Sequence, residues 1–304
     1  MGPWSGSTPR ARPAGRRRRV RLCPPESEWA RAWSWWGPPK GEVLAYDADG
    51  QLKWKASVRS ELLAAPAAGD GVVVVRTADS RLFGLSPADG QRKWVYQRPN
   101  PSLTVRSAAG VQIYRGAVFA GFAGGKLAAL NAVTGAVGWE AAVALPKGTT
   151  ELERVTDITS NPVLDDRKVC AVAFQGRLAC MDILRGSVLW ARDLSSYAGL
   201  VMDRRYIYVT DDKGAVHAFD AERGASVWKQ DKLFARRVTA PQVVGNWVAV
   251  GDLEGYVHFL SAEDGSFAAR IATDGSAIAA QPARIEDKIL VQTRKGGLFA
   301  ISVK

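Results

Sequence analysis

Short stretches of alternating hydrophobic and polar residues follow one another throughout residues 41–304. Many are rich in Val, Ile, Tyr and Trp, and they are separated by Gly, Pro, Asn and Asp, which are typical of turns. The 3.6-residue period of an amphipathic helix is absent from these stretches. The pattern therefore predicts an all-β protein built from short antiparallel strands.

A longer repeat organises these strands. A segment reading Gly-x-Leu/Val-x-small-apolar recurs and is followed about ten residues later by Gly-x-x-x-Trp. Successive copies are 38 to 51 residues apart, close to the roughly 40–45 residues of one four-stranded propeller blade. The repeat therefore predicts a β-propeller whose blades are meanders of strands A to D. The copies begin at Gly41, Ser80, Gly125, Gly176, Gly214, Gly255 and Gly296.

Two positions of the repeat predict how the blades pack. A tryptophan at one equivalent position is expected to seal each blade against the next. The fourth residue after the initial Gly is small in every copy but one, and we expect it to admit a closely packed neighbouring blade. In the sixth copy Phe259 takes the small position and Ala269 takes the tryptophan position, which predicts a degenerate blade. The repeat tryptophans are Trp54, Trp94, Trp139, Trp190 and Trp228.

The number of blades is the next expectation. Residues 41–58 supply only strands C and D, and residues 278–304 supply only strands A to C. About six to six and a half blades are thus predicted, as part of a larger ring. The complete blades are expected at residues 64–97, 107–143, 158–194, 197–233 and 238–273.

Residues 1–40 differ from the propeller domain predicted for residues 41–304. They contain nine Lys or Arg and two Asp or Glu, whereas the rest of the chain contains 32 and 28, so the net charge of +11 belongs mainly to this leader. The nearly neutral body gives no indication of nucleic-acid binding. The repeat begins abruptly at Gly41, and no apolar signal run follows Arg16–Arg19. We expect a disordered and non-native leader, from a frameshift or a wrong start.

Few side chains carry chemistry that would indicate catalysis or metal binding. Three scattered cysteines are too few for a disulfide framework or a zinc site. Cys170 and Cys180 flank a predicted B–C turn, so they either form a cross-strand disulfide or, as the small position of Cys180 favours, remain free. His217 and His258 share one repeat position but lack further ligands. No catalytic residue, metal site or cofactor is predicted.

Two insertions are the better candidates for a binding surface. Residues 96–110 and 144–162 account for the longest spacings between copies, and both immediately precede a strand A, so both project from the same rim. Each combines apolar and charged residues. Loops on one rim of a scaffold are either plain solvated connections or a binding surface, and the composition of this pair favours a protein-binding rim.

The tryptophan-bearing repeat resembles that of the pyrroloquinoline-quinone-type propellers. Within these, three long segments outside the generic repeat are similar to the BamB family of the Gram-negative barrel-assembly machinery. The resemblance covers residues 41–304, nearly all of the predicted propeller. It implies an eight-bladed fold, of which this chain matches the end of the second blade to the end of the eighth. The segments are PSLTVRS (101–107), GTTELERVTDITSNPV (148–163) and residues 233–267.

The resemblance implies a non-catalytic lipoprotein at the periplasmic face of the outer membrane. Such a scaffold binds the periplasmic POTRA domains of BamA and assists the insertion of outer-membrane proteins, with unfolded outer-membrane proteins as further partners. One departure concerns the lipid anchor, because Cys23 follows neither an apolar signal nor small residues. By matching position, the predicted BamA contacts are an apolar pair with charge complementarity at its edge: Leu103, Val105, Arg106 and Asp157.

Two other functions are compatible with a propeller. A pyrroloquinoline-quinone-dependent dehydrogenase needs a Ca²⁺ site of clustered carboxylate and amide ligands, an Asp base and often adjacent cysteines. No copy of the repeat carries an extra carboxylate cluster, and no two cysteines are adjacent. A WD-type interaction propeller would show Gly-His and Trp-Asp signatures, which the copies lack. The scaffold interpretation is therefore preferred.

Overall fold

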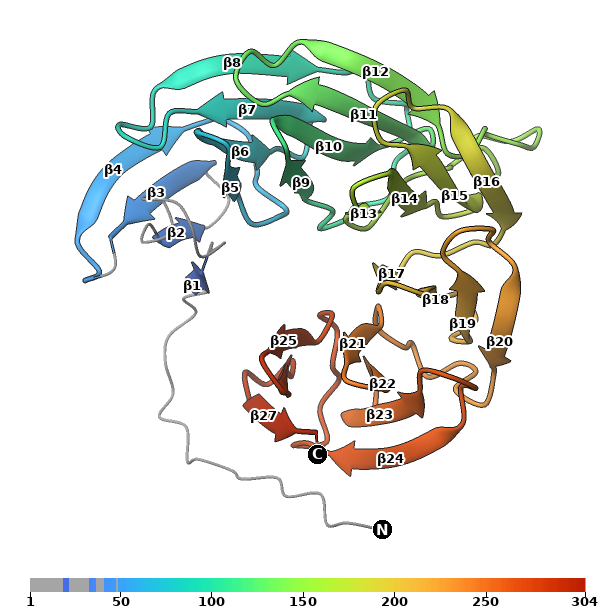
Figure 1. Ribbon diagram of the computed structural model, residues 1–304. Helices are drawn as coiled ribbons and strands as arrows, with labels where there is room; N and C mark the ends of the chain where they lie inside the picture. The colour runs from blue at the N-terminus through green and yellow to red at the C-terminus, as the bar shows by residue number, and fades with distance from the viewer. Residues whose placement is uncertain (1–18, 22–32, 37–40, 48, 304) are drawn as a thin grey trace. The chain divides into compact units, whose positions relative to one another are not determined.

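The computed structural model describes residues 19–21, 33–36, 41–47 and 49–303. Throughout this part of the chain the regular structure consists of β-strands, and no helix occurs (Figure 1). The described residues accordingly include no helical segment of the length and apolarity needed to span a membrane. The prediction of an all-β protein is confirmed.

The strands form antiparallel meanders, and the chain divides into two compact units, residues 14–189 and residues 190–304. Four sheets begin in the first unit. Their strands are β1 (Arg19–Arg21), β2 (Trp33–Trp36), β3 (Glu42–Tyr46) and β4 (Leu52–Ser57); β5 (Ala67–Gly69), β6 (Val72–Arg76), β7 (Arg81–Leu85) and β8 (Arg92–Gln97); β9 (Val111–Tyr114), β10 (Ala117–Phe122), β11 (Lys126–Asn131) and β12 (Val137–Ala142); and β13 (Val163–Leu164), β14 (Lys168–Val172), β15 (Arg177–Asp182) and β16 (Val188–Asp193).

The second unit contains two four-stranded sheets and one three-stranded sheet. Within each unit the first strands of neighbouring sheets lie side by side, as β5 does with β9 and β21 with β25 (Figure 1). The strands are β17 (Gly199–Met202), β18 (Tyr206–Thr210), β19 (Val216–Asp220) and β20 (Ser226–Gln230); β21 (Gln242–Val244), β22 (Trp247–Gly251), β23 (Tyr256–Ser261) and β24 (Phe267–Ala272); and β25 (Ala283–Ile285), β26 (Lys288–Gln292) and β27 (Leu298–Ser302).

The five complete blades occur where the repeat predicts them, and the last sheet has the three predicted strands. The first sheet differs from the prediction, because β1 and β2 precede β3 in it and complete four strands. Residues 19–21 and 33–36 are thus strands of this sheet, and the expected disorder of the leader stays a prediction. The sequence of β2, Trp-Ser-Trp-Trp, has the aromatic composition that favours strands. The rest of residues 1–40, with Cys23, lies outside the described residues.

The repeat tryptophans seal blades as predicted, and they do so by the same contact each time. Each indole N–H donates a hydrogen bond to a backbone carbonyl of the following blade, which satisfies its one polar group while the ring is buried. The donor–acceptor distances are 2.8 Å for Trp54 to Pro87, 2.9 Å for Trp94 to Ala132, 3.1 Å for Trp139 to Ile183, 3.3 Å for Trp190 to Ala221 and 3.0 Å for Trp228 to Ala262.

From the second blade to the sixth, the glycine four residues before the tryptophan position serves the preceding blade as well as its own turn. Gly90 has φ +73°, which only glycine adopts freely. A Cβ atom added to Gly90 would lie 2.5 Å from Cε3 of Trp54, the tryptophan of the preceding blade. The same arrangement recurs in the following blades, so turn and packing both require glycine here. The equivalent residues are Gly135, Gly186, Gly224 and Gly265.

The small position of the repeat has a different cause from the one expected. Gly84 lies directly opposite Trp94 across β7 and β8, and a Cβ atom on Gly84 would be 2.1 Å from the indole. The small residue thus accommodates the tryptophan of its own blade rather than a neighbouring blade. In the sixth blade Phe259 lies opposite Ala269 in the same register. That blade is consequently not degenerate, because the large and the small side chain have exchanged strands.

Cys170 and Cys180 lie opposite each other in β14 and β15 and are joined by a disulfide. Both side chains are fully buried. The sequence allowed either a cross-strand disulfide or two free cysteines, and the structure contains the disulfide. The small position of the repeat is therefore occupied by a bonded cysteine at Cys180.

Candidate functional site

The two insertions form neighbouring loops in the unit 14–189. One, residues 98–110, joins β8 to β9, and the other, residues 143–162, joins β12 to β13. We call them loop 1 and loop 2, and we call the surface they expose the two-loop surface. Because each loop enters the first strand of a blade, both lie at the same end of their sheets, as the sequence predicts.

Three hydrogen bonds tie loop 1 to loop 2. Ser102 Oγ donates to Glu151 Oε2 at 2.7 Å, and the backbone N–H of Gly110 donates to Asn161 Oδ1 at 2.5 Å. Between them, the N–H of Val105 donates to Asp157 Oδ2 at 2.6 Å. Hydrogen bonds that accept on an ionised carboxylate are stronger than neutral ones. The loops therefore form one connected element.

Asp157 is an internal residue of this element. Its side chain is buried, and its second oxygen, Oδ1, accepts the N–H of Gly124 at 3.1 Å. Its backbone bridges Ala123 on one side and Phe174 on the other. Asp157 was expected to give charge complementarity at the edge of a binding surface. In the structure its carboxylate holds loop 1 against the third blade, and its contact with a partner stays a prediction.

Arg76 lies beneath loop 1 and was not identified from the sequence. Burial lowers the pKa of its guanidinium to about 10, and the negative charge of Asp157 opposes that shift. The guanidinium carbon is 5.3 Å from the centre of the Phe122 ring, and Nη1 has no hydrogen-bond partner in the described part of the chain. A cavity of ≈ 40 Å³ lined by Arg76, Val105 and Asp157 is large enough for a water molecule.

Loop 2 has a local structure of its own that presents Leu152. Glu153 Oε2 accepts the N–H groups of Thr149 at 2.9 Å and Thr150 at 3.1 Å, while Thr150 Oγ1 accepts the N–H of Glu153 at 3.2 Å. This reciprocal Thr-x-x-Glu arrangement satisfies backbone donors within a single turn. It leaves Leu152 70% exposed at the tip.

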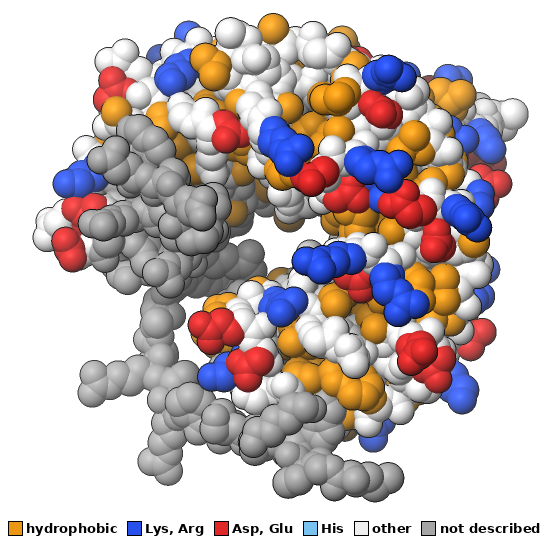
Figure 2. Space-filling view, in the orientation of Figure 1, with side chains coloured by type: hydrophobic (Ala, Val, Ile, Leu, Met, Phe, Trp, Pro, Cys, Tyr) orange, Lys and Arg blue, Asp and Glu red, His pale blue; other side chains and the backbone are white. Residues whose placement is uncertain are grey.

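The outward side of the two-loop surface contains the other predicted residues. Leu103 is 47% exposed and Val105 is half-buried beside it. The Arg106 side chain is 71% exposed and pairs with Glu61, which lies before β5. Figure 2 shows positive, negative and hydrophobic side chains interspersed over the visible face rather than a patch of one sign. An apolar centre bordered by charge is typical of protein–protein contacts.

The two histidines each pair with an aspartate of their own blade. His217 Nε2 lies 2.9 Å from Asp211 Oδ2, and His258 Nε2 lies 2.8 Å from Asp252 Oδ2. Hydrogen bonds from His258, the Tyr256 N–H and Arg236 outweigh burial and lower the pKa of Asp252 to about 2. Nowhere among the described residues do three or more His, Cys, Asp or Glu gather as metal ligands. The pairs are thus features of the repeat.

This chain is similar to proteins of one family. The family model described as "Outer membrane protein assembly factor BamB" matches residues 36–230. The protein of that name from Nitrosomonas eutropha is 50% identical over 269 residues, which cover 88% of this chain and 66% of the relative. The one from Bordetella pertussis is 46% identical over 264 residues, covering 86% of this chain and 68% of the relative. The chain spans about two thirds of the length of these curated relatives.

Solved structures give the same result. The crystal structure of BamB from Moraxella catarrhalis superposes with a TM-score of 0.84 at 28% sequence identity. The superposition covers 90% of this chain and 82% of that chain. Both the sequence and the arrangement of blades therefore match one family of propellers.

Proposed function

The chain belongs to the family of outer membrane protein assembly factor BamB, and from this premise we propose that it is a non-catalytic scaffold of outer-membrane protein assembly. The scaffold acts at the periplasmic face of the outer membrane, and its partner is the POTRA region of BamA. Unfolded outer-membrane proteins are further partners, and membrane attachment is through a lipid anchor, as the resemblance to intact family members implies. The names of the relatives, which are all assembly factors, support this function.

The observation that supports the proposal best is the fixed geometry of the two-loop surface. Asp157 binds the backbone of loop 1 at Val105, so the segment that carries Leu103, Val105 and Arg106 is held in place before a partner binds. A surface that is already ordered loses less conformational entropy when a partner binds. Leu103 and Val105 supply the apolar contact, and Arg106 supplies the charge at its edge. Arg106 exchanges Glu61 for an acidic residue of the partner.

Arg106→Glu is the variant that tests this surface. The substitution places a negative charge beside Glu61 and reverses the sign presented to the partner, so we expect binding to the isolated POTRA region of BamA to weaken about tenfold. The measurement is surface plasmon resonance with the full chain at two salt concentrations. Thermal unfolding should be nearly unchanged, because the side chain is exposed.

A matched control is Arg115→Glu. Arg115 lies in the turn between β9 and β10 at the opposite end of the blade, with a side chain 67% exposed and paired with Asp166 at 3.0 Å. It therefore has the same exposure and the same kind of partner as Arg106. Equal affinities of the wild-type chain and both variants would contradict the proposed contact, and equal weakening in both would show a general effect of charge.

A further inference from the structure

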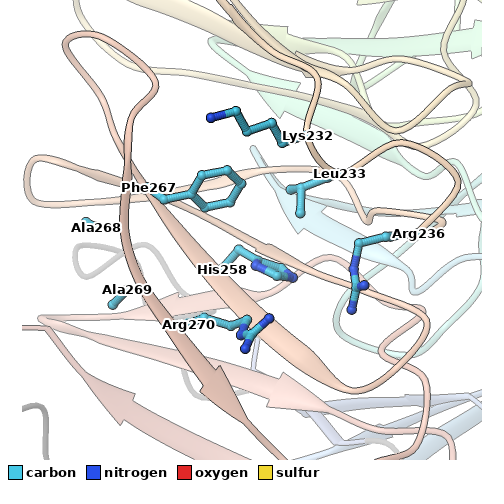
Figure 3. A pocket seen from close by; sticks show the side chains of 8 residues that line it. All are labelled: Lys232, Leu233, Arg236, His258, Phe267, Ala268, Ala269 and Arg270. Atoms are coloured by element: carbon cyan, nitrogen blue, oxygen red, sulfur yellow. The ribbon is translucent and has the colours of Figure 1, made fainter.

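A pocket in the unit 190–304 is separate from the two-loop surface. It has a volume of ≈ 410 Å³ and lies between the segment that joins β20 to β21 and the outer strands β23 and β24 (Figure 3). This size is in the range of ordinary ligand sites. Its lining includes the side chains of Lys232, Leu233, Arg236, His258, Phe267 and Arg270.

Two arginines converge on one wall of this pocket. The guanidinium carbons of Arg236 and Arg270 lie 5.9 Å and 4.8 Å from the centre of the same ring, that of Tyr256. In Figure 3 both side chains turn toward the His258 ring. Guanidinium groups bind carboxylates through paired N–H donors in a fixed fork. This wall therefore presents donors suited to an oxyanion.

Arg236 is held in position by the fold. Its guanidinium contacts Asp252 Oδ2 and Glu254 Oε2, each at 2.7 Å, and the Asp252 side chain is fully buried. Asp252 Oδ2 also accepts a hydrogen bond from Nε2–H of His258 at 2.8 Å. In contrast, Arg270 and Lys232 have no acidic partner in the described part of the unit, so the pocket carries excess positive charge.

An aromatic ring provides an apolar wall. Phe267 is 41% exposed, and its ring centre lies 6.0 Å from that of His258. Leu233, which is buried, lies beside it in the lining. A ligand that enters the pocket can therefore place an apolar group on Phe267 and a negative group at the arginines.

We propose that this pocket binds an acidic segment of a polypeptide partner, with one carboxylate between Arg236 and Arg270 and an adjacent apolar side chain on Phe267. A concave site of this volume admits a single protruding group, whereas a lipid surface contacts a broad basic face. Carboxylates of Asp252 and Glu254 lie beside Arg236, so its positive charge is not part of such a face. The pocket shares no residue with the two-loop surface, so its test is independent of BamA binding.

The test uses the full chain and a fluorescent eight-residue peptide that contains two Phe-Glu pairs, with fluorescence anisotropy as the readout. We expect saturable binding that is lost when both Glu are replaced by Gln. Arg270→Gln should weaken binding about tenfold, the effect of one charged hydrogen bond. Lys232→Gln should weaken it less. Arg270 is suited to substitution because it is exposed and does not hold the buried Asp252.

Arg204→Gln is the matched control, because Arg204 is an exposed arginine in the β17–β18 turn of the same unit. It should bind the peptide as the wild type does. An affinity that Arg270→Gln leaves unchanged, or equal binding of the Glu and Gln peptides, would overturn the proposal. Binding of inorganic phosphate or of phosphatidylglycerol vesicles with none of the peptide would also overturn it.

Discussion

At the scale of single residues, Asp157 decides whether loop 1 is ordered. In Asp157→Asn the amide keeps only one oxygen to accept the N–H groups of Val105 and Gly124. The buried guanidinium of Arg76 also loses the nearby negative charge that stabilises its charged form. We expect a loss of about 2 kcal/mol in the free energy of unfolding. We also expect faster hydrogen exchange at the Val105 amide in the absence of any partner. Exchange and unfolding at wild-type values would instead assign Asp157 the role of a direct contact.

The sequence predicts whether a side chain is buried or exposed from its place relative to the repeat. Leu103 and Arg106 are exposed because they lie in an insertion outside the strand pattern. The direction of Asp157 could not be predicted, since loop residues have no period that assigns them to a face. Arg76 was missed for a related reason. A single Arg that ends the run Val72–Val75 is a weak signal of a buried charge, and its partner is 81 positions away in the chain.

At the scale of strands, the exchange of Phe259 and Ala269 predicts strong energetic coupling. Phe259→Ala should cost about 3–5 kcal/mol by opening a cavity, and Ala269→Trp should cost about 1–3 kcal/mol by overpacking against Phe259. The double variant restores the pairing of the other blades, so its cost should fall well below the sum. Chemical denaturation measures all three, with Ala268→Trp, at an exposed position of the same strand, as the control. Additive costs would show that the pair is not a packing unit.

The strands themselves were almost fully predictable, because alternation and turn residues repeat with every blade. The cause of the small position was not, because it depends on the register between strands C and D. A bulge shifts that register in five of the C–D pairs, for example between Gly84 and Leu85. Sequence alone identifies two special positions in a blade, but only the register shows that Gly84 and Trp94 face each other.

At the scale of the whole molecule, the fold does not distinguish a scaffold from an enzyme, because one fold can host unrelated functions. A quinone-dependent enzyme differs from a scaffold in having residues that bind Ca²⁺ and the quinone. The described residues contain no group of three or more His, Cys, Asp or Glu that could hold a metal ion. Their two buried aspartates, Asp157 and Asp252, are engaged by backbone N–H groups, His258 and Arg236. The residues in the described part of the chain therefore do not fit a quinone–Ca²⁺ centre.

Reconstitution of the full chain with pyrroloquinoline quinone and Ca²⁺ tests this conclusion. A ligand that binds only the folded state raises the melting temperature with its concentration. We therefore expect neither a rise in melting temperature nor dye-linked oxidation of alcohols, while a known quinoprotein dehydrogenase treated in parallel shows both. Turnover by this chain would revive the enzymatic alternative. A rise in melting temperature without turnover would show that the propeller binds the quinone. That result would contradict the conclusion drawn from its carboxylates.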